Sequence, residues 1–182
     1  DVESRGLGDV YKRQGSVSIE GDIGSIPAET FYNCTSLTSV SIGTSISSIG
    51  SQAFAECSSL SQFTIPESVG SIGDKAFYDC TSLTGITIPA GVSSIGSNVF
   101  TGCSRLASIS AASGNGTYAS SDGCLYNKAM TRLIRCPEGK SGAKIATSTV
   151  TIGAGAFANC KSVTSLTVPD SVNTIETDAF LS

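Results

Sequence analysis

A 23-residue period constrains this chain more than any other feature of its sequence. Phe31, Phe54, Phe77 and Phe100 follow one another at intervals of 23 residues. A cysteine follows each of these phenylalanines by three residues, and a leucine follows each cysteine by a further three. After an irregular gap, Phe157 resumes the pattern. A fixed period of this length is typical of repeat proteins, in which each unit packs only on its neighbours.

The repeated apolar positions define the expected core. One unit is too short to bury a core of its own, so equivalent side chains of successive units must lie over one another in columns. Phenylalanine, leucine and cysteine are among the residue types most often found buried. The side chains expected in the core are Phe31, Phe54, Phe77, Phe100, Phe157, Phe180, Cys34, Cys57, Cys80, Cys103, Cys160, Leu37, Leu60, Leu83 and Leu106.

Within each unit the pattern is typical of short strands and turns. In residues 40–42 two apolar residues flank a serine, which is the alternation of a half-buried strand. Pro66, Pro89 and Pro169 then end the equivalent strands of other units. A glycine recurs at the position of Gly73, where we expect a positive φ or a close approach of two backbone segments. The short Ala-Phe segment is expected to form a single helical or 3₁₀ turn.

The repeat resembles the BspA-type leucine-rich repeat family (LRR_5-like surface proteins). Residues 60–80, LSQFTIPESVGSIGDKAFYDC, follow the family pattern Leu-x-x-Val-x-Ile-Pro-x-Ser-Val-x-x-Ile-Gly-x-x-Ala-Phe-x-x-Cys closely. The irregular stretch 122–137 is also similar to an insert of such proteins, in which the position of Cys124 usually holds an aliphatic residue. The resemblance implies proteins at the cell surface or secreted, which adhere to host or microbial surface proteins.

The predicted fold is a β-rich leucine-rich-repeat solenoid of 23-residue repeats, built from short strands, turns and single helical or 3₁₀ turns. It forms one domain over residues 15–182, with an irregular hairpin insertion at about 111–146. Residues 1–14 match no position of the repeat and are expected to be a leader or an artefact. Because the ends of a solenoid present unpaired strand edges, we also expect self-association through them.

Composition and charge exclude several classes of partner. The net charge is −4 and only 14% of residues are charged, so the chain lacks the clustered lysines and arginines that nucleic-acid binding requires. No run approaches the roughly 18 consecutive apolar residues of a membrane helix, so no membrane insertion is expected in this chain.

Catalytic and cofactor chemistry also find little support in the sequence. The chain contains no histidine, which removes the usual general base and the usual nucleophile arrangements. Five of the seven cysteines occupy one position of the repeat and no Cys-x-x-Cys pair occurs, so neither a zinc site nor any cofactor is expected. We therefore expect a protein that is not an enzyme.

Cys124 and Cys136 stand apart from the cysteine column, because they flank a predicted hairpin. If its turn centres on Met130, the two side chains face each other and can form a disulfide; otherwise both remain free thiols.

Two surfaces are candidate binding sites. Outward positions of the predicted main strand form a polar strip, which is either an extended binding surface or only a means of solubility. The basic hairpin either meets an anionic partner or is merely a solvated insertion. The strip residues are Ser41, Thr64, Thr87, Ser110 and Thr167. The basic residues are Lys128, Arg132, Arg135 and Lys140.

Together these features predict a non-enzymatic protein-binding or adhesion module of a cell-surface or secreted protein. One alternative is a structural spacer that holds another domain away from a surface. A further alternative is glycan or ice binding by the Ser/Thr strip.

Overall fold

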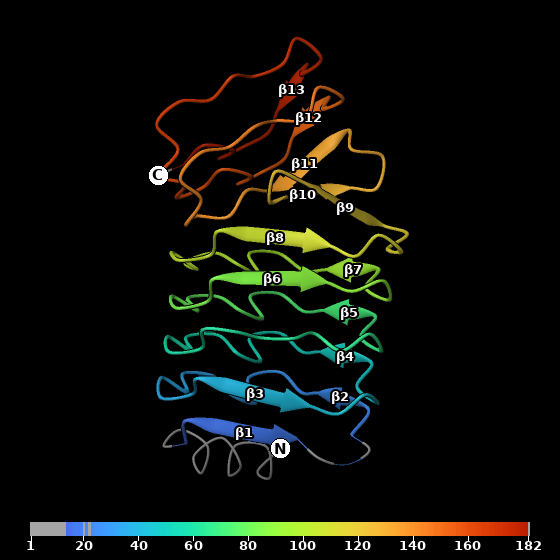
Figure 1. The fold of residues 1–182 in the computed structure, drawn as a ribbon, viewed down its shortest axis with the longest axis vertical. Helices are drawn as coiled ribbons and strands as arrows, with labels where there is room; N and C mark the ends of the chain where they lie inside the picture. Colours follow the sequence, from blue (N-terminus) through green and yellow to red (C-terminus); the bar gives the residue numbers. More distant parts are fainter. Residues whose placement is uncertain (1–13, 20, 22, 182) are drawn as a thin grey trace.

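The computed structural model describes residues 14–19, 21 and 23–181, and it shows a stack of β-coils along one axis (Figure 1). Neighbouring coils pair in register at a spacing of 23 residues, as in the pairs Ser25 with Ser48, Ser48 with Ser71 and Ser71 with Ser94. The predicted β-solenoid is therefore confirmed. The suggested leader at 1–14 falls, except for residue 14, outside the described residues.

Two parallel ladders run up the N-terminal stack, which we define as residues 15–111. The longer strands are β1 (Ser16–Ile19), β3 (Ser39–Ile42), β6 (Gly85–Ile88) and β8 (Ser108–Ala111), with β1 paired to β3 and β6 to β8. The shorter strands are β2 (Ser25–Ile26), β4 (Ser48–Ile49), β5 (Ser71–Ile72) and β7 (Ser94–Ile95), which form one continuous sheet. Residues 60–65 occupy the level between β3 and β6 without forming a regular strand.

The chain then leaves this pattern in a junction segment, residues 112–144, before the C-terminal stack, residues 145–181. The remaining strands are β9 (Tyr118–Ser121), β10 (Cys124–Asn127), β11 (Arg132–Arg135), β12 (Thr151–Ile152) and β13 (Thr174–Ile175). Strands β9, β10 and β11 are antiparallel, whereas β11, β12 and β13 are parallel. Figure 1 shows that β9 to β13 are tilted relative to the strands of the N-terminal stack.

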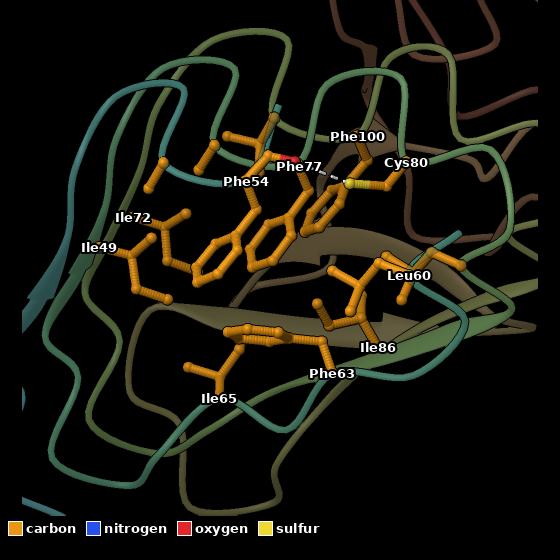
Figure 2. Packing of buried hydrophobic residues seen from close by; sticks show 14 of the residues in the cluster. Ile49, Phe54, Leu60, Phe63, Ile65, Ile72, Phe77, Cys80, Ile86 and Phe100 are labelled. Carbon is orange, nitrogen blue, oxygen red and sulfur yellow. Dashed lines mark hydrogen bonds between the residues drawn. The ribbon is translucent and has the colours of Figure 1, made fainter. Parts of the chain in front are cut away.

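Stacked aromatic rings form the central column of the N-terminal stack (Figure 2). The ring centroids of Phe31 and Phe54 lie 5.1 Å apart, those of Phe54 and Phe77 5.5 Å, and those of Phe77 and Phe100 6.0 Å. Phe63 packs its ring 4.8 Å from both Phe54 and Phe77. Offset stacking adds to the free energy gained from burying such large side chains.

The cysteines of the repeat are buried and have a hydrogen-bonding role. The thiols of Cys57, Cys80 and Cys103 each donate to the carbonyl oxygen of the phenylalanine 26 residues earlier, at 3.1 Å. Figure 2 shows the bond from Cys80. A small apolar side chain with a weak donor suits this position, because it fills the core and satisfies a buried carbonyl of the preceding coil.

Most of the expected core residues are buried, and one is not. Phe180 is 45% exposed although it stacks on Phe157 at 5.2 Å. The prediction that Phe180 is a core residue is therefore wrong, because within residues 14–181 no later coil covers its other side. The buried members are Phe31, Phe54, Phe77, Phe100, Phe157, Cys34, Cys57, Cys80, Cys103, Cys160, Leu37, Leu60, Leu83 and Leu106.

The prediction of a helical or 3₁₀ turn at the Ala-Phe segment is also wrong, since the described residues contain no helix. The segment consists of successive tight turns instead. Their amides alternate between the same coil and the next: Ala53 N donates to Gly50 O, whereas Phe54 N donates to Ala76 O. Polar residues such as Gln52 take a positive φ here, which permits this alternation.

The recurring glycine is required by close backbone packing and not by its φ. A side chain at Gly73 would place its Cβ 2.5 Å from the backbone nitrogen of Ser51 in the preceding coil. Gly50 and Gly96 are in the same situation, against Ala28 and Asp74. Only glycine lets successive coils approach this closely.

Strand β10 lies between two separate cores. Leu125 packs in the core of the N-terminal stack, whereas Cys124 and Tyr126 pack in a second core with residues of the C-terminal stack. All three are almost completely buried. Because successive side chains of a strand point to opposite faces, this one strand joins both cores.

Candidate binding surface

The polar strip follows directly from the alternation of the main strands. In β6 the side chains of Ile86 and Ile88 are buried and Thr87 between them is exposed. The parallel register places Thr87 beside Ser110 of β8, and Ser18 beside Ser41. Equivalent outward side chains therefore form a row across the coils. We define Ser41, Thr64, Thr87 and Ser110 as the polar strip.

The hydroxyls of this strip differ from those hydroxyls of the repeat that link neighbouring coils. Among the described residues, the side-chain hydroxyls of Thr64, Thr87 and Ser110 have no hydrogen-bond partner. Six hydroxyls in or beside the turns, in contrast, donate to a carbonyl of the preceding coil. These structural donors are Thr38, Ser47, Ser68, Thr81, Thr84 and Ser93. The strip hydroxyls are thus available to a partner.

A shallow depression of about 310 Å³ opens on this strip. Thr64 and Thr87 line it together with Gly85, whose missing side chain leaves room between neighbouring coils. Buried apolar residues, among them Phe63 and Ile86, also contribute to its lining. A surface that combines exposed apolar atoms with unpaired hydroxyls is suited to recognition of a partner.

The structure does not bring all five predicted strip residues together. The strip ends at β8, where Ile109 N donates to Gly123 O at 2.9 Å and Ala111 N donates to Ser120 Oγ at 3.0 Å. Thr167 is exposed but belongs to the C-terminal stack, where residues 163–168 form no strand. The junction segment therefore separates Thr167 from the rest.

The predicted basic residues are bound within the chain. Arg132 forms a bidentate pair with Glu176, with both N–O distances at 2.5 Å. The hydrogen bonds from Arg132 lower the pKa of the Glu176 carboxyl from its ordinary value of 4.5. Lys128 Nζ donates to Asn115 O at 2.6 Å, and Lys140 Nζ lies 3.4 Å from Asp122 Oδ1.

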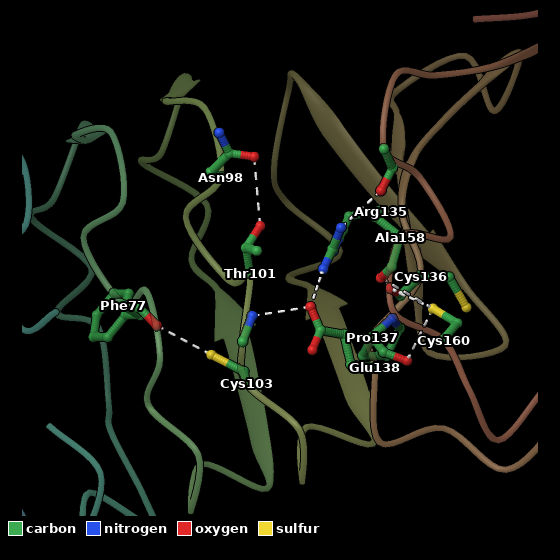
Figure 3. Close-up of polar contacts among 12 residues, drawn as sticks. Phe77, Asn98, Thr101, Cys103, Arg135, Cys136, Pro137, Glu138, Ala158 and Cys160 are labelled. Atoms are coloured by element: carbon green, nitrogen blue, oxygen red, sulfur yellow. Dashed lines mark hydrogen bonds and ion pairs between the residues drawn. The ribbon is translucent and has the colours of Figure 1, made fainter. Parts of the chain in front are cut away.

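Arg135 is the most enclosed of these cations, with 12% of its side chain exposed. Its Nη1 donates to Gly155 O at 2.7 Å and its Nη2 to Glu138 Oε1 at 2.6 Å (Figure 3). Arg132, Arg135 and Lys140 are paired with carboxylates, and only Lys128 is bonded to a neutral carbonyl, so the four cations offer an anionic ligand few uncompensated charges. The geometry therefore favours the polar strip as the binding surface.

Three polar residues of the junction, which the repeat pattern does not reveal, replace parts of a missing coil. Buried Asn115 donates through Nδ2 to Pro89 O and Val92 O. The Tyr118 hydroxyl accepts a hydrogen bond from Ile95 N at 3.0 Å, at the open edge of β7. Glu138 accepts one from Gly102 N. Burial raises the pKa of the Tyr118 hydroxyl. The only sequence signal for these residues is that they fall where the period breaks.

The buried thiols are poor nucleophiles. Burial raises the pKa of Cys57 and of Cys103 to about 12. The reactive form of a cysteine is the thiolate, so these side chains act as packing groups. Within the described residues, no group of three or more His, Cys, Asp or Glu side chains is placed to hold a metal ion.

A second depression, of about 450 Å³, lies in the C-terminal stack. Phe157, Val163, Leu166 and Phe180 line it with Cys160 and Lys161. Ile175 and Leu181, which are close to Phe180 in the sequence, are also more than half exposed. Several large apolar side chains are therefore exposed in the C-terminal stack.

Comparison with known proteins places these features in a family. The family model for the BspA type leucine rich repeat region matches residues 24–141 and 140–182, in six copies. No curated protein sequence matches the chain. None of the described residues forms a helix with the length and apolar character needed to span a membrane.

Solved structures with the same fold come from bacteria. A leucine-rich repeat protein of Eubacterium ventriosum is 25% identical, with a TM-score of 0.75 over 95% of this chain and 52% of its own. A leucine rich cell surface protein of Faecalibacterium prausnitzii is 27% identical, with a TM-score of 0.53 over 92% of this chain and 66% of its own. The pneumococcal vaccine antigen PcpA is 23% identical, with a TM-score of 0.74 over 91% of this chain and 48% of its own. The chain thus spans about half the length of the Eubacterium ventriosum protein and of PcpA.

Proposed function

Because the chain belongs to the BspA-type leucine-rich repeat family, we propose that it is a non-enzymatic module that binds other proteins through the polar strip. The observation that carries this proposal is the contrast between hydroxyls. Several hydroxyls of the repeat, such as that of Thr84, are bonded to the preceding coil, whereas those of Thr64, Thr87 and Ser110 have no partner within the described residues. Rigid repeat scaffolds commonly use such extended surfaces for binding.

We further propose that the module works at the cell surface or in secreted form, against surface proteins of a host or of other microbes. The relative from Faecalibacterium prausnitzii is described as a cell surface protein, which supports this location. The low charge of the strip favours a neutral protein surface over an anionic polymer as the partner.

The experiment is an array of purified extracellular-matrix, serum and bacterial surface proteins probed with the labelled chain. The strip is then blocked by Thr64→Arg and Thr87→Arg, whose long side chains fill the depression. The matched control is Ser162→Arg, on an exposed residue of the C-terminal stack. We expect binding to be lost in the first two variants and kept in the control.

Three other results would redirect the proposal. Absence of binding to every protein on the array would favour a structural spacer, and signal restricted to a glycan array or to thermal hysteresis would favour glycan or ice binding. Binding that falls with Arg132→Ser, Arg135→Ser and Lys140→Ser, but not with the strip variants, would move the site to the hairpin.

Self-association through the apolar C-terminal depression is a separate proposal about partners. Phe180 and Val163 line this depression, and nearly half of the Phe180 side chain is exposed. Sedimentation at increasing concentration is expected to show oligomers that Phe180→Asp abolishes. A monomer at all concentrations would exclude it.

A further inference from the structure

The junction segment places two cysteines directly opposite each other on neighbouring strands. In the antiparallel pair of β10 and β11, Leu125 lies opposite Arg135, so Cys124 lies opposite Cys136 one position further out. The turn between them contains Met130 with a positive φ of 58°. Asn127 holds this turn by accepting hydrogen bonds from Thr131 N and Arg132 N through its side-chain oxygen.

The two sulfur atoms are within reach of a covalent bond. Both cysteines are fully buried in the second core, with their Sγ atoms 2.6 Å apart. An S–S bond is about 2.05 Å long, so bond formation requires only a small movement. The cysteines of the repeat differ, since Cys57, Cys80 and Cys103 donate their thiols to carbonyl oxygens of the preceding coil.

We propose that Cys124 and Cys136 form a disulfide that fixes the junction between the two stacks. The reaction is thiol–disulfide exchange with an external disulfide, such as oxidised glutathione or the active-site disulfide of an oxidoreductase. One cysteine thiolate attacks that disulfide and releases a first thiolate, and the second cysteine then attacks the mixed disulfide and releases another. The two cysteines lose two electrons and two protons, and the external disulfide becomes two thiols.

Burial dictates when the bond forms and how long it persists. Neither sulfur is exposed in the folded chain, so exchange takes place while the hairpin is formed but not yet packed between the cores. Once folded, the same burial shields the bond from reductants. Because β10 contacts both cores and β11 pairs with β12, the bond ties the C-terminal stack to the N-terminal stack.

The test is a thiol count on the full chain, refolded from the reduced and unfolded state in a glutathione redox buffer. After denaturation and alkylation, we expect five of the seven cysteines to be modified, against seven after treatment with dithiothreitol. Trypsin cuts after Lys128, Arg132 and Arg135, so the bond would join fragments 106–128 and 136–140, which are otherwise separate.

Variants identify the pair. Cys124→Val is expected to leave six alkylated cysteines, and the control Cys103→Ala is expected to leave four and keep the joined fragments.

Seven alkylated cysteines in the refolded wild-type chain would overturn the proposal. A disulfide that involves Cys160, whose thiol lies 3.4 Å from Cys136 O, would also overturn it. The wild-type count does not depend on whether a variant folds. Failure of the disulfide proposal would leave the proposed function of the polar strip unaffected, because the strip lies in the N-terminal stack.

Discussion

Glu138 accepts a hydrogen bond from the backbone amide of Gly102 at 2.9 Å, in place of the carbonyl that the next regular coil would supply (Figure 3). In the coils below, Glu56 N donates to Tyr78 O and Asp79 N donates to Thr101 O. Gly102 is the next residue in this series, at a spacing of 23. A side-chain carboxylate therefore continues the ladder where the backbone departs from the repeat.

Replacing Glu138 with alanine should destabilise the fold strongly. The change removes the carboxylate partner of Arg135, whose side chain is only 12% exposed. It also leaves the Gly102 amide without a hydrogen-bond acceptor. Loss of one partner of a buried ion pair costs about 3–5 kcal/mol of unfolding free energy. Equilibrium urea unfolding measures the effect.

Two further variants serve as a conservative comparison and as a control for Glu138→Ala. Glu138→Gln keeps an oxygen acceptor for Gly102 and should lose less stability than the alanine variant. Lys161→Ala, at an exposed position of the same molecule, should change the unfolding free energy by less than about 0.5 kcal/mol. Equal stability of Glu138→Ala and the wild type would show that the contact contributes nothing.

Phe77→Ala should be among the most destabilising changes in the core. The ring is fully buried and stacks on Phe54 and Phe100, and Phe63 packs against its edge. Truncation of a buried phenylalanine costs about 3–5 kcal/mol. Phe180→Ala, at the equivalent position of the C-terminal stack but with the side chain 45% exposed, should cost much less in the same urea experiment. A loss below about 1 kcal/mol for Phe77→Ala would contradict the importance of the column.

The periodic parts of the molecule could be predicted from the sequence, because one 23-residue rule fixes strand, turn and core at every coil. The buried glycine contacts and the outward position of Thr87 follow from the same rule. The junction could not be predicted in this way, since Asn115, Tyr118 and Glu138 satisfy backbone groups of other coils through side chains. The sequence predicted that Cys124 faces Cys136 only if the turn of the hairpin centres on Met130, and the observed register places them opposite each other.

The ion pair between Arg132 and Glu176 could also not be predicted from the sequence. Arg132 and Glu176 are 44 residues apart and fall in different coils, with no motif to connect them. Glu176 occupies a position of the repeat where other coils have the close-packed glycine. The pair forms because β12 and β13 continue, in parallel, the sheet that contains β11.

Gly73→Ala should destabilise the stack although it adds only one methyl group. The new Cβ would lie 2.5 Å from Ser51 N and 2.9 Å from Ser51 Cα, both backbone atoms that cannot move independently. Such overpacking costs about 1–3 kcal/mol.

The matched control for Gly73 lies three residues earlier. A Cβ at Gly70 would be 3.7 Å from Ser47 O, an ordinary contact, and Gly70→Ala should stabilise the chain by about 0.4–1 kcal/mol through the unfolded state. Thermal and urea unfolding of both variants test the comparison. Equal effects of the two substitutions would refute the close-approach explanation.

The Arg132 and Glu176 pair should make the stability of the C-terminal stack depend on pH. The hydrogen bonds from Arg132 lower the pKa of Glu176 in the folded chain, so the folded state binds this proton less tightly than the unfolded state. The contribution is therefore present above the ordinary pKa of 4.5 and is lost as the pH falls through the lower folded value. Urea midpoints measured between pH 7 and pH 3 should fall less steeply in Glu176→Gln than in the wild type.

Arg132→Gln should flatten this pH profile in the same way, because it removes the cause of the shift in the pKa of Glu176. Added salt should reduce the difference, since Arg132 is 41% exposed. Superimposable profiles for all three chains would show that the pair does not contribute to stability.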